Sequence, residues 1–425
     1  MTGAVCATSE GVSTMADPKA LLVGYNGANN TGAEALLLAD IADIRTVLGP
    51  GARLTIPALE PENLARYVGD MPGVDIVAMP MIFLSTARRL VRQHDLIVLV
   101  EGATYMDSGA SALLWYFMWA TSCAHAAGKP CLAYAVDAGE LKPHNRWLVR
   151  HTAPKTDLIV VRSAAAAERL RGLGIENRIE VTADNAFRFE PRAADGLWLE
   201  QAWPEGGAAP VGFACVDYNL WPVVIRPWGR RADCYRWPYY FSRSPARRAA
   251  TAALADGYAQ LADAIVERHG RSVALICMEQ LDEKLAGQIH RRMAHRERAR
   301  IFSARRHDAS QMTALLRSLG ALVTSRYHAS VLSIAAAVPQ VAVAQDLRLR
   351  TLFDEMGMPE LCIDPGPGMF DVLHTTIDRL LADDDVLRAR LRREYERHLE
   401  SARRNPEFLA AFVAEHGWRP RAWAA

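Results

Sequence analysis

The stretch Ala321-Leu-Val-Thr-Ser-Arg-Tyr-His-Ala-Ser-Val-Leu-Ser-Ile-Ala-Ala-Ala-Val-Pro339 is the part of the sequence around which the rest of the chain is arranged. It opens with a short apolar run, which predicts the end of a buried strand. Thr324 and Ser325 then offer side chains that can cap a helix, and apolar residues recur at helical spacing until Val338-Pro339 ends it. A strand that leads directly into a helix is typical of parallel α/β sheets.

Arg326 and His328 stand at or near the predicted N-terminus of that helix. Backbone N–H groups and the helix dipole favour an anion at such a position. A guanidinium and an imidazole add donors that suit a phosphate or a carboxylate. The alternative at this point is an arginine that pairs with a nearby acid and a histidine that fills a turn.

Composition limits the classes of protein to which the chain can belong. It has 425 residues, half of them apolar, which favours two domains. Lys and Arg number 49 and Asp and Glu 48, so a general nucleic-acid or membrane surface is not indicated, although local basic clusters are a separate matter. No segment has the length of a transmembrane span. Residues 1–16 lack the pattern of a signal peptide and are expected to be a disordered leader.

The cysteines and histidines point to neither disulfides nor a metal. The seven cysteines form no CxxC pair, and the histidines lack the spacing of metal ligands. We therefore expect reduced thiols in a cytoplasmic protein without a bound metal.

The N-terminal part reads as a doubly wound α/β domain. Ala20–Gly24 predicts a buried strand, and a loop rich in Gly and Asn follows it. Thr31 and Glu34 have the spacing of a capping box for a helix over Ala35–Val47. The loop is not GxGxxG, so we interpret it as a generic ligand-facing loop, with a tight turn that serves only backbone geometry as the alternative.

Further strands alternate with helices through this part, which predicts a parallel sheet. They are expected at Ala52–Pro57, Val74–Met79, Asp95–Val100, Pro130–Val136, Leu158–Val161 and Ile179–Asp184. Polar residues at the carboxyl ends of parallel strands face the crevice in which ligands bind. This rule places on one rim the loop 26–32, Glu101, Asp137, Arg162 and Asp184.

A second α/β series follows a stretch rich in Gly, Pro and Ala around residues 193–209. We expect an N-terminal domain over 17–200, a C-terminal domain over 206–395 and a helical tail over 396–425 that crosses back over the hinge. The strands of the second domain are expected at Val211–Val216, Ser272–Met278, Arg300–Ser303, Ala321–Val323 and Gln340–Ala344. Two such domains in tandem leave a cleft between them.

An insertion over residues 217–248 interleaves aromatic and basic side chains. They are Trp221, Trp228, Tyr235, Trp237, Tyr239 and Tyr240 with Arg226, Arg230, Arg231, Arg236 and Arg243. Aromatic faces beside arginine donors suit a sugar or a phosphorylated carrier, which makes Trp221 and Arg226 candidates for substrate contact. Single-stranded nucleic acid and a loop that packs its own aromatic side chains over the core are the alternatives.

The chain resembles the polysaccharide pyruvyl transferase family. Ser325-Arg326-Tyr327-His328 through Val338-Pro339 is similar to its Ser-x-Arg-x-His-like segment and the helix that follows. The next strand, with Asp346 and Arg348 after it, resembles the family's Asp-containing loop and basic residue. Weaker likenesses lie in the expected order at Asn26 to Glu34, Arg162-Ser163 and Ala183 to Phe187. The resemblance spans roughly Leu21 to Leu361.

The chain also departs from the family pattern. Ala33 stands where the family has Asp, and Asn185 replaces Pro. Glu101-Gly102-Ala103 replaces a run of glycines. Arg348 replaces Lys, which keeps the charge but changes the hydrogen-bonding geometry. Three of these departures lie in the N-terminal domain and bear on the acceptor.

The resemblance implies two Rossmann-like domains that face each other across a cleft, as in GT-B glycosyltransferases. It implies phosphoenolpyruvate as co-substrate without a further cofactor. The acceptor is a sugar, often lipid-linked or polymeric, that receives a pyruvate ketal at two hydroxyls. Such a protein is expected in the cytoplasm, with the inner membrane surface as a second location. A nucleotide-sugar glycosyltransferase and a non-catalytic glycan-binding protein are the alternatives.

The site roles follow from that reaction. Arg326 is the expected anion clamp, and His328 the acid/base group or a phosphate ligand. Arg162 is a second clamp, and Asp184 or Asp346 a base for an acceptor hydroxyl. The remaining expected substrate contacts are Ser325, Asn29, Asn30, Gly32 and Arg348.

Overall fold

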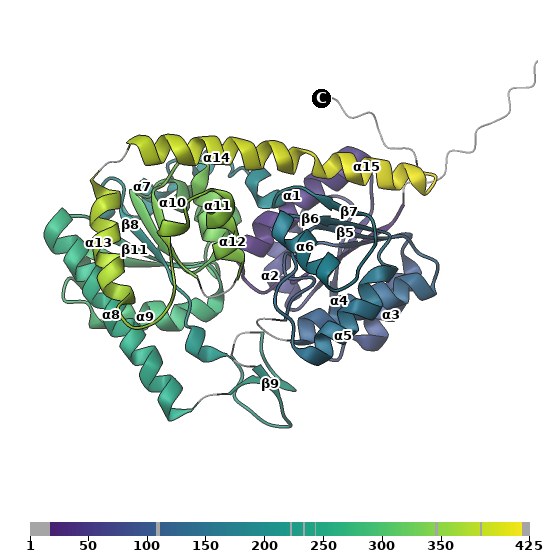
Figure 1. Ribbon diagram of the computed structural model, residues 1–425, viewed down its shortest axis with the longest axis horizontal. Coiled ribbons are helices and arrows are strands. Elements are labelled where there is room, and N and C mark those ends of the chain that lie inside the picture. Colours follow the sequence, from purple (N-terminus) through teal and green to yellow (C-terminus); the bar gives the residue numbers. More distant parts are fainter. Residues whose placement is uncertain are drawn as a thin grey trace, which may run out of the picture.

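The computed structural model describes residues 18–107, 111–221, 223–232, 234–242, 244–344, 347–382 and 385–418. These residues form two α/β domains side by side (Figure 1). The expected leader, Asp346 and Arg243 lie outside the described residues.

The first domain has a seven-stranded sheet in the order β3-β2-β1-β4-β5-β6-β7, with every pairing parallel. Its strands are β1 Ala20–Val23, β2 Leu54–Ala58, β3 Val74–Ala78, β4 Leu96–Leu99, β5 Cys131–Val136, β6 Leu158–Val161 and β7 Ile179–Val181. Its helices are α1 Thr31–Leu48, α2 Pro61–Val68, α3 Leu84–Gln93, α4 Ser111–Ala126, α5 Pro143–Thr152 and α6 Ala164–Gly172. The order reverses between β1 and β4, as in the doubly wound fold.

The second domain repeats this order in a six-stranded parallel sheet, β12-β11-β8-β13-β14-β15. Its strands are β8 Val211–Ala214, β11 Val273–Cys277, β12 Ala299–Ser303, β13 Ala321–Thr324, β14 Gln340–Val343 and β15 Cys362–Ile363. Its helices are α8 Pro245–His269, α9 Glu283–Arg292, α10 Ala309–Arg317, α11 Tyr327–Ile334, α12 Leu347–Glu355 and α13 Met369–Leu381, and the short helix α7 Trp198–Ala202 precedes them. The expected fold class, two parallel-sheet domains, is confirmed.

Both faces of the first sheet are covered. Leu21 and Val23 of β1 belong to a buried cluster with side chains of α3, α4, α5 and α6. Ala20 and Leu22, which point to the opposite face, belong to a second cluster with α1 and α2. Successive side chains of a strand point to opposite faces of the sheet, and both faces are buried here. This explains why the strands appear in the sequence as continuous apolar runs.

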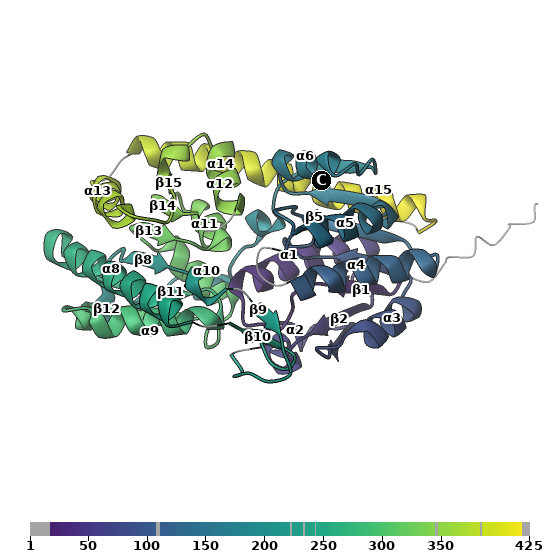
Figure 2. The same ribbon diagram turned by 60° about the horizontal axis from the view of Figure 1, so that its bottom comes forward.

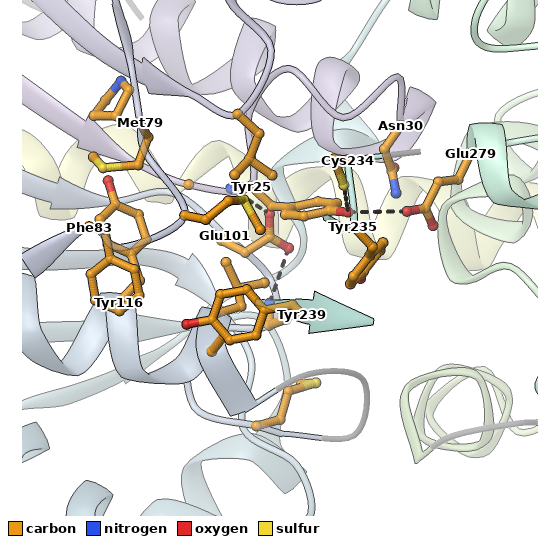
Figure 3. A pocket seen from close by; sticks show the side chains of 18 of the residues that line it. Tyr25, Asn30, Met79, Phe83, Glu101, Tyr116, Cys234, Tyr235, Tyr239 and Glu279 are labelled. Atoms are coloured by element: carbon orange, nitrogen blue, oxygen red, sulfur yellow. Dashed lines mark hydrogen bonds between the residues drawn. The ribbon is translucent and has the colours of Figure 1, made fainter. Parts of the chain in front are cut away.

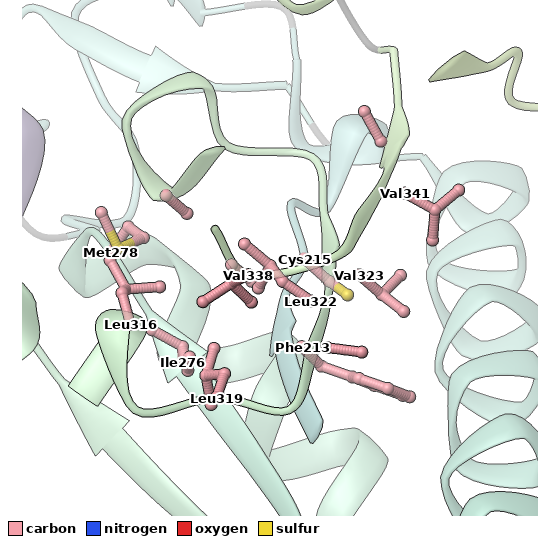
Figure 4. Close-up of a cluster of buried hydrophobic side chains, with 14 of the residues drawn as sticks. Phe213, Cys215, Ile276, Met278, Leu316, Leu319, Leu322, Val323, Val338 and Val341 are labelled. Carbon is pink, nitrogen blue, oxygen red and sulfur yellow. The ribbon is translucent and has the colours of Figure 1, made fainter. Parts of the chain in front are cut away.

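The stretch from Ala321 to Pro339 forms β13 and α11 in the second core. Leu322 and Val323 pack among Phe213, Val338 and Val341 (Figure 4), and each such buried side chain contributes about 1.5–3 kcal/mol to stability.

Three local expectations are wrong. Helix α11 starts at Tyr327 without a side-chain cap, because the Thr324 hydroxyl accepts a hydrogen bond from the Arg326 backbone N–H instead. The helix ends at Ile334, before Val338-Pro339, and Ala337 turns the chain with φ 51°. Helix α1 begins at Thr31, so Thr31 and Glu34 form no capping box; Asn30 caps the helix by accepting from the Ala33 backbone N–H.

The aromatic insertion is a hairpin, with β9 Val223–Ile225 antiparallel to β10 Tyr239–Phe241. It lies between the two domains at the bottom of Figure 1 and at the lower edge of Figure 2. Arg231 and Arg236 both contact Glu60 of the first domain, at 3.1 and 3.0 Å. The hairpin therefore leaves the second domain and is anchored on the first.

The C-terminal helices run across both domains (Figure 1). Helix α14, Asp385–Arg403, adds Leu391 and Ala402 to the core of the second domain. Helix α15, Asn405–Glu415, adds Leu409 and two further side chains to the core of the first. The expected boundary between residues 395 and 396 falls inside α14.

Candidate functional site

A cavity of about 230 Å³ lies where the first domain, the second domain and the hairpin meet (Figure 3). Its wall has a polar side and an apolar side. The polar side is formed by Tyr25, Asn30, Glu101, Glu279, Arg326 and Arg348. The apolar side is formed mainly by Met79, Met81, Phe83, Met106, Leu113 and Tyr116. Trp221, Cys234, Tyr235 and Tyr239 of the insertion close the cavity.

Tyr25 joins the two domains inside the polar side. Its hydroxyl donates to Glu279 Oε1 at 3.3 Å and lies 3.3 Å from the Cys234 sulfur (Figure 3). Burial raises the pKa of Tyr25 well above its usual value. The hydroxyl therefore stays protonated and can act as a donor at neutral pH.

Glu101 is held on the cavity wall by backbone groups. Its carboxylate accepts from the backbone N–H of Tyr25 and of Ala103, each at 3.3 Å (Figure 3). Glu101 follows β4, which pairs with β1 at the centre of the sheet. The carboxyl ends of these two strands therefore supply both the carboxylate and the backbone N–H groups that orient it. A partly buried carboxylate on the cavity wall can accept a hydrogen bond from a ligand hydroxyl.

Arg326 belongs to the same polar side and is paired with two acids. Its Nη1 is 2.9 Å from Glu279 Oε2, and its Nε donates to Asp282 at 3.0 Å. Burial alone would lower the pKa of Arg326, but the two acids hold it above its usual value. Burial raises the pKa of Asp282 to about 6 against the opposing charge of Arg326. Pairing with nearby acids is the alternative that the sequence left open, and a contact with a ligand anion stays a prediction.

His328 sits at the domain interface, next to the cavity but outside its lining. The ring packs on helix α1 at Gly32, where an added Cβ would lie 2.1 Å from His328 Nδ1. Its Nε2 lies 3.6 Å from Asp184 Oδ2 of the first domain. Gly32 is thus needed for the close approach of the histidine, and a direct contact between Gly32 and substrate stays a prediction.

Arg162 and Asp184 form a buried network behind the cavity. The guanidinium contacts Asp137 at 2.8 Å and Asp184 at 2.5 Å. The ring of Tyr327, from α11, lies 4.1 Å from its central carbon. Although burial opposes the charge, Arg162 and then His328 hold the pKa of Asp184 below its usual range. Gly102 permits this packing, because an added Cβ there would lie 2.5 Å from Arg162 Nη1.

A family model described as polysaccharide pyruvyl transferase matches residues 30–346. The chain belongs to the polysaccharide pyruvyl transferase family. The resemblance expected from the Ser325 to Pro339 segment is thereby confirmed. No curated protein matches the chain.

Solved structures similar to this family member include GT-B-fold epimerases and glycosyltransferases. A UDP-N-acetylglucosamine 2-epimerase matches with a TM-score of 0.60 at 11% identity, over 97% of this chain and 100% of that one. The Neisseria meningitidis UDP-GlcNAc 2-epimerase bound to UDP-GlcNAc matches with a TM-score of 0.58 at 10% identity, over 93% and 100%. A Rickettsia africae glycosyltransferase matches with a TM-score of 0.52 at 10% identity, over 94% and 97%. At such identities the likeness concerns the fold alone.

The loop before α1 docks this transferase's two domains on each other. Asn29, in the left-handed region with φ 47°, donates from its side chain to Gln280 at 3.1 Å. The Thr31 backbone N–H donates to the Met278 carbonyl at 2.8 Å. Asn30 both caps α1 and lines the cavity.

The other expected site residues divide between the cavity and its surroundings. Arg348, on α12, and Trp221 line the cavity. Ser325 is buried beside Arg326, with its backbone N–H bonded to Ala214. Arg226 stays within the hairpin, where it donates to the Phe241 carbonyl at 3.1 Å and approaches the Tyr240 ring. Trp221 also packs on Phe241, with ring centroids 5.3 Å apart, so the insertion both packs its own aromatic side chains and faces the cavity.

The sequence reasoning omitted Tyr25 and Glu279 from the candidate site. Glu279 lies two residues beyond Cys277, where β11 ends, so the strand-end rule that selected Glu101 would have found it too. Within the described residues, no His, Cys, Asp and Glu side chains gather as metal ligands. In the same part of the chain, no helix is long and apolar enough to cross a bilayer.

Proposed function

We propose that the protein transfers the pyruvyl group of phosphoenolpyruvate to a sugar and forms a ketal across two hydroxyls. The observation that carries the proposal is one cavity with two arginines on one wall and a tyrosine and two carboxylates beside them. Phosphoenolpyruvate carries a carboxylate and a phosphate, and cationic side chains are needed to bind them. The sugar carries several hydroxyls, which bind to side chains that donate or accept hydrogen bonds.

The reaction requires a defined movement of protons. The methylene carbon of phosphoenolpyruvate gains a proton and becomes a methyl group. One sugar hydroxyl attacks the adjacent carbon, the C–O bond to phosphate breaks, and a second hydroxyl closes the ketal. The two hydroxyls lose one proton each; one balances the proton gained by carbon and the other leaves on inorganic phosphate.

Arg326 and Arg348 are the proposed donor-side groups. The two acids that flank Arg326 fix the plane of its guanidinium, which favours a defined geometry for a bound anion. Arg348 lines the same cavity and also the small cavity beside Arg162, so it stands between the substrate wall and the buried network.

Glu101 is the proposed base on the acceptor side. Asp184, a base expected from the sequence, is buried and paired with Arg162, whereas the carboxylate of Glu101 faces the cavity. The hydroxyl of Tyr25 can orient the sugar from the same side. A carboxylate within reach of the attacking hydroxyl takes up its proton as the C–O bond forms.

His328 remains the proposed proton donor to carbon. Its contact with Gly32 holds the imidazole against α1, so this role requires the ring to turn toward the cavity. The apolar wall beside the polar side suits an acceptor that carries an apolar group, and we propose a lipid-linked sugar on that ground. Such an acceptor places the protein in the cytoplasm, at the membrane surface.

The test is turnover with phosphoenolpyruvate. The protein is incubated with phosphoenolpyruvate and candidate glycosides, with and without a lipid carrier. The masses of the products are determined by mass spectrometry, and the release of inorganic phosphate is measured in parallel. One ketal gained per phosphate released supports the proposal. Transfer only from nucleotide-sugars, with none from phosphoenolpyruvate, contradicts it and favours a glycosyltransferase.

A further inference from the structure

Exposed apolar side chains gather beside the cavity. In the described part of the chain, nine large apolar residues are strongly exposed, and five of them lie in two short segments that also line the cavity. These five are Ile82, Leu84, Ile225, Trp228 and Trp237. Trp228 is 76% exposed and Trp237 is 53% exposed. Apolar side chains gathered in this way mark an interaction surface rather than the scattered exposure of an ordinary surface.

The two segments, residues 81–93 and 223–242, are here named the rim surface. Met81 and Phe83 of the first and Tyr235 and Tyr239 of the second border the same cavity. The hairpin is fixed rather than loosely attached, because Arg231 and Arg236 share Glu60. In Figures 1 and 2 the hairpin lies at the lower edge of the molecule, between the two domains. Its exposed side chains are therefore open to a partner that approaches from this edge.

The rim surface is also strongly basic. Its two segments hold three and four arginines against one acid, Asp233, in a chain whose net charge is only +1. The seven are Arg88, Arg89, Arg92, Arg226, Arg230, Arg231 and Arg236. Glu60 neutralises part of this charge, but Arg230 and the helix α3 arginines are exposed. Tryptophan with arginine is the composition that sits at the boundary of an anionic bilayer.

We propose that the rim surface docks the protein on an anionic lipid bilayer. The exposed Trp and Ile side chains enter the headgroup region, and the arginines pair with lipid phosphates. The cavity then opens toward the bilayer, because the segments that bind lipid are those that line it. This docking is independent of the transfer reaction and can be measured without any substrate.

The test is sedimentation with vesicles of phosphatidylcholine, with and without phosphatidylglycerol. We expect binding to the anionic vesicles, weakened by salt, and little binding to phosphatidylcholine alone. The double variant Trp228→Ser with Trp237→Ser should lower the partition coefficient at least ~10-fold. Arg230→Gln should lower it about fivefold. The matched control is Trp147→Ser, on α5, whose indole is 64% exposed but lies outside the rim surface, and it should bind like the wild type.

A second measurement guards against a misfolded variant. Brominated phosphatidylglycerol should quench part of the tryptophan fluorescence of the wild type, and this part should be absent in the double variant. Failure to bind anionic vesicles, or an equal loss of binding in Trp147→Ser, would overturn the proposal. So would self-association through this surface without lipid binding, or binding of soluble acidic glycans alone.

Discussion

The variant Gly32→Ala tests whether His328 is seated on helix α1 as the structure has it. A Cβ at residue 32 would lie 2.1 Å from His328 Nδ1 and 2.4 Å from its Cγ, so the ring or the helix must shift. Overfilling of a packed site costs about 1–3 kcal/mol. Alanine would otherwise favour the first turn of α1 over glycine by up to ~1 kcal/mol. We expect a net loss of about 1–2 kcal/mol.

Urea unfolding followed by circular dichroism and fluorescence measures this loss. The matched control is Gly172→Ala in α6, where an added Cβ meets nothing within 4 Å, and it should be neutral or stabilising. The double variant with His328→Ala removes the ring and leaves only the Cβ of residue 328, 2.7 Å from the added Cβ, so the two substitutions should be non-additive by about 1 kcal/mol. A Gly32→Ala protein as stable as the wild type, or additive losses in the double variant, would refute the reasoning.

Three further outcomes follow from the buried and cavity-lining charges. Arg162→Met should destabilise the fold by about 3–5 kcal/mol in thermal melting, since Asp137 and Asp184 lose their buried cation. The control is Arg178→Met at an exposed arginine, which should change stability by under ~1 kcal/mol. Equal effects of the two variants would contradict the role of Arg162 in the buried network. Glu101→Gln should lower the rate of pyruvyl transfer about 100-fold with an unchanged Tm, and an unchanged rate would remove Glu101 as the base. Burial raises the pKa of Glu34 to about 8, so the folded chain holds a proton that the unfolded chain releases, and stability falls as pH rises from the ordinary glutamate value to about 8. Glu34→Gln should make this fall shallower; parallel plots of Tm against pH for variant and wild type would show that Glu34 is not its source.

The two parallel sheets could be predicted from the sequence, because apolar runs such as Leu158–Val161 alternate with segments of helical spacing. The helix starts could not. Asn29, Asn30 and Thr31 are consecutive residues that can each cap a helix, and a tertiary contact decides between them. The Thr31 backbone N–H reaches the Met278 carbonyl of the other domain, which leaves Asn30 as the cap.

The arginines of the site could be selected from their places at strand ends, but their partners could not. Arg326 pairs with Asp282, 44 residues earlier in the chain, and Arg162 with Asp184, 22 residues later. No local pattern indicates which acid of a 425-residue chain will meet a given arginine, since the contact depends on how neighbouring loops turn. The position of the arginines at the carboxyl ends of the strands was therefore predictable from the sequence. Their pairing with particular acids, which sets the net charge around them, was not.

The C-terminal helix α15 has a consequence for how the molecule is made. Leu409, Phe412 and Val413 are buried in the core of the first domain, yet they come more than 200 residues after Val181, where the last strand of its sheet ends. Each contributes about 1.5–3 kcal/mol once buried. A nascent chain that has released the whole first sheet from the ribosome still lacks this part of its core, so the first domain is completed only after the second domain has been synthesised. A stop codon before residue 405 would accordingly weaken the first domain, although it leaves every strand of that domain in place.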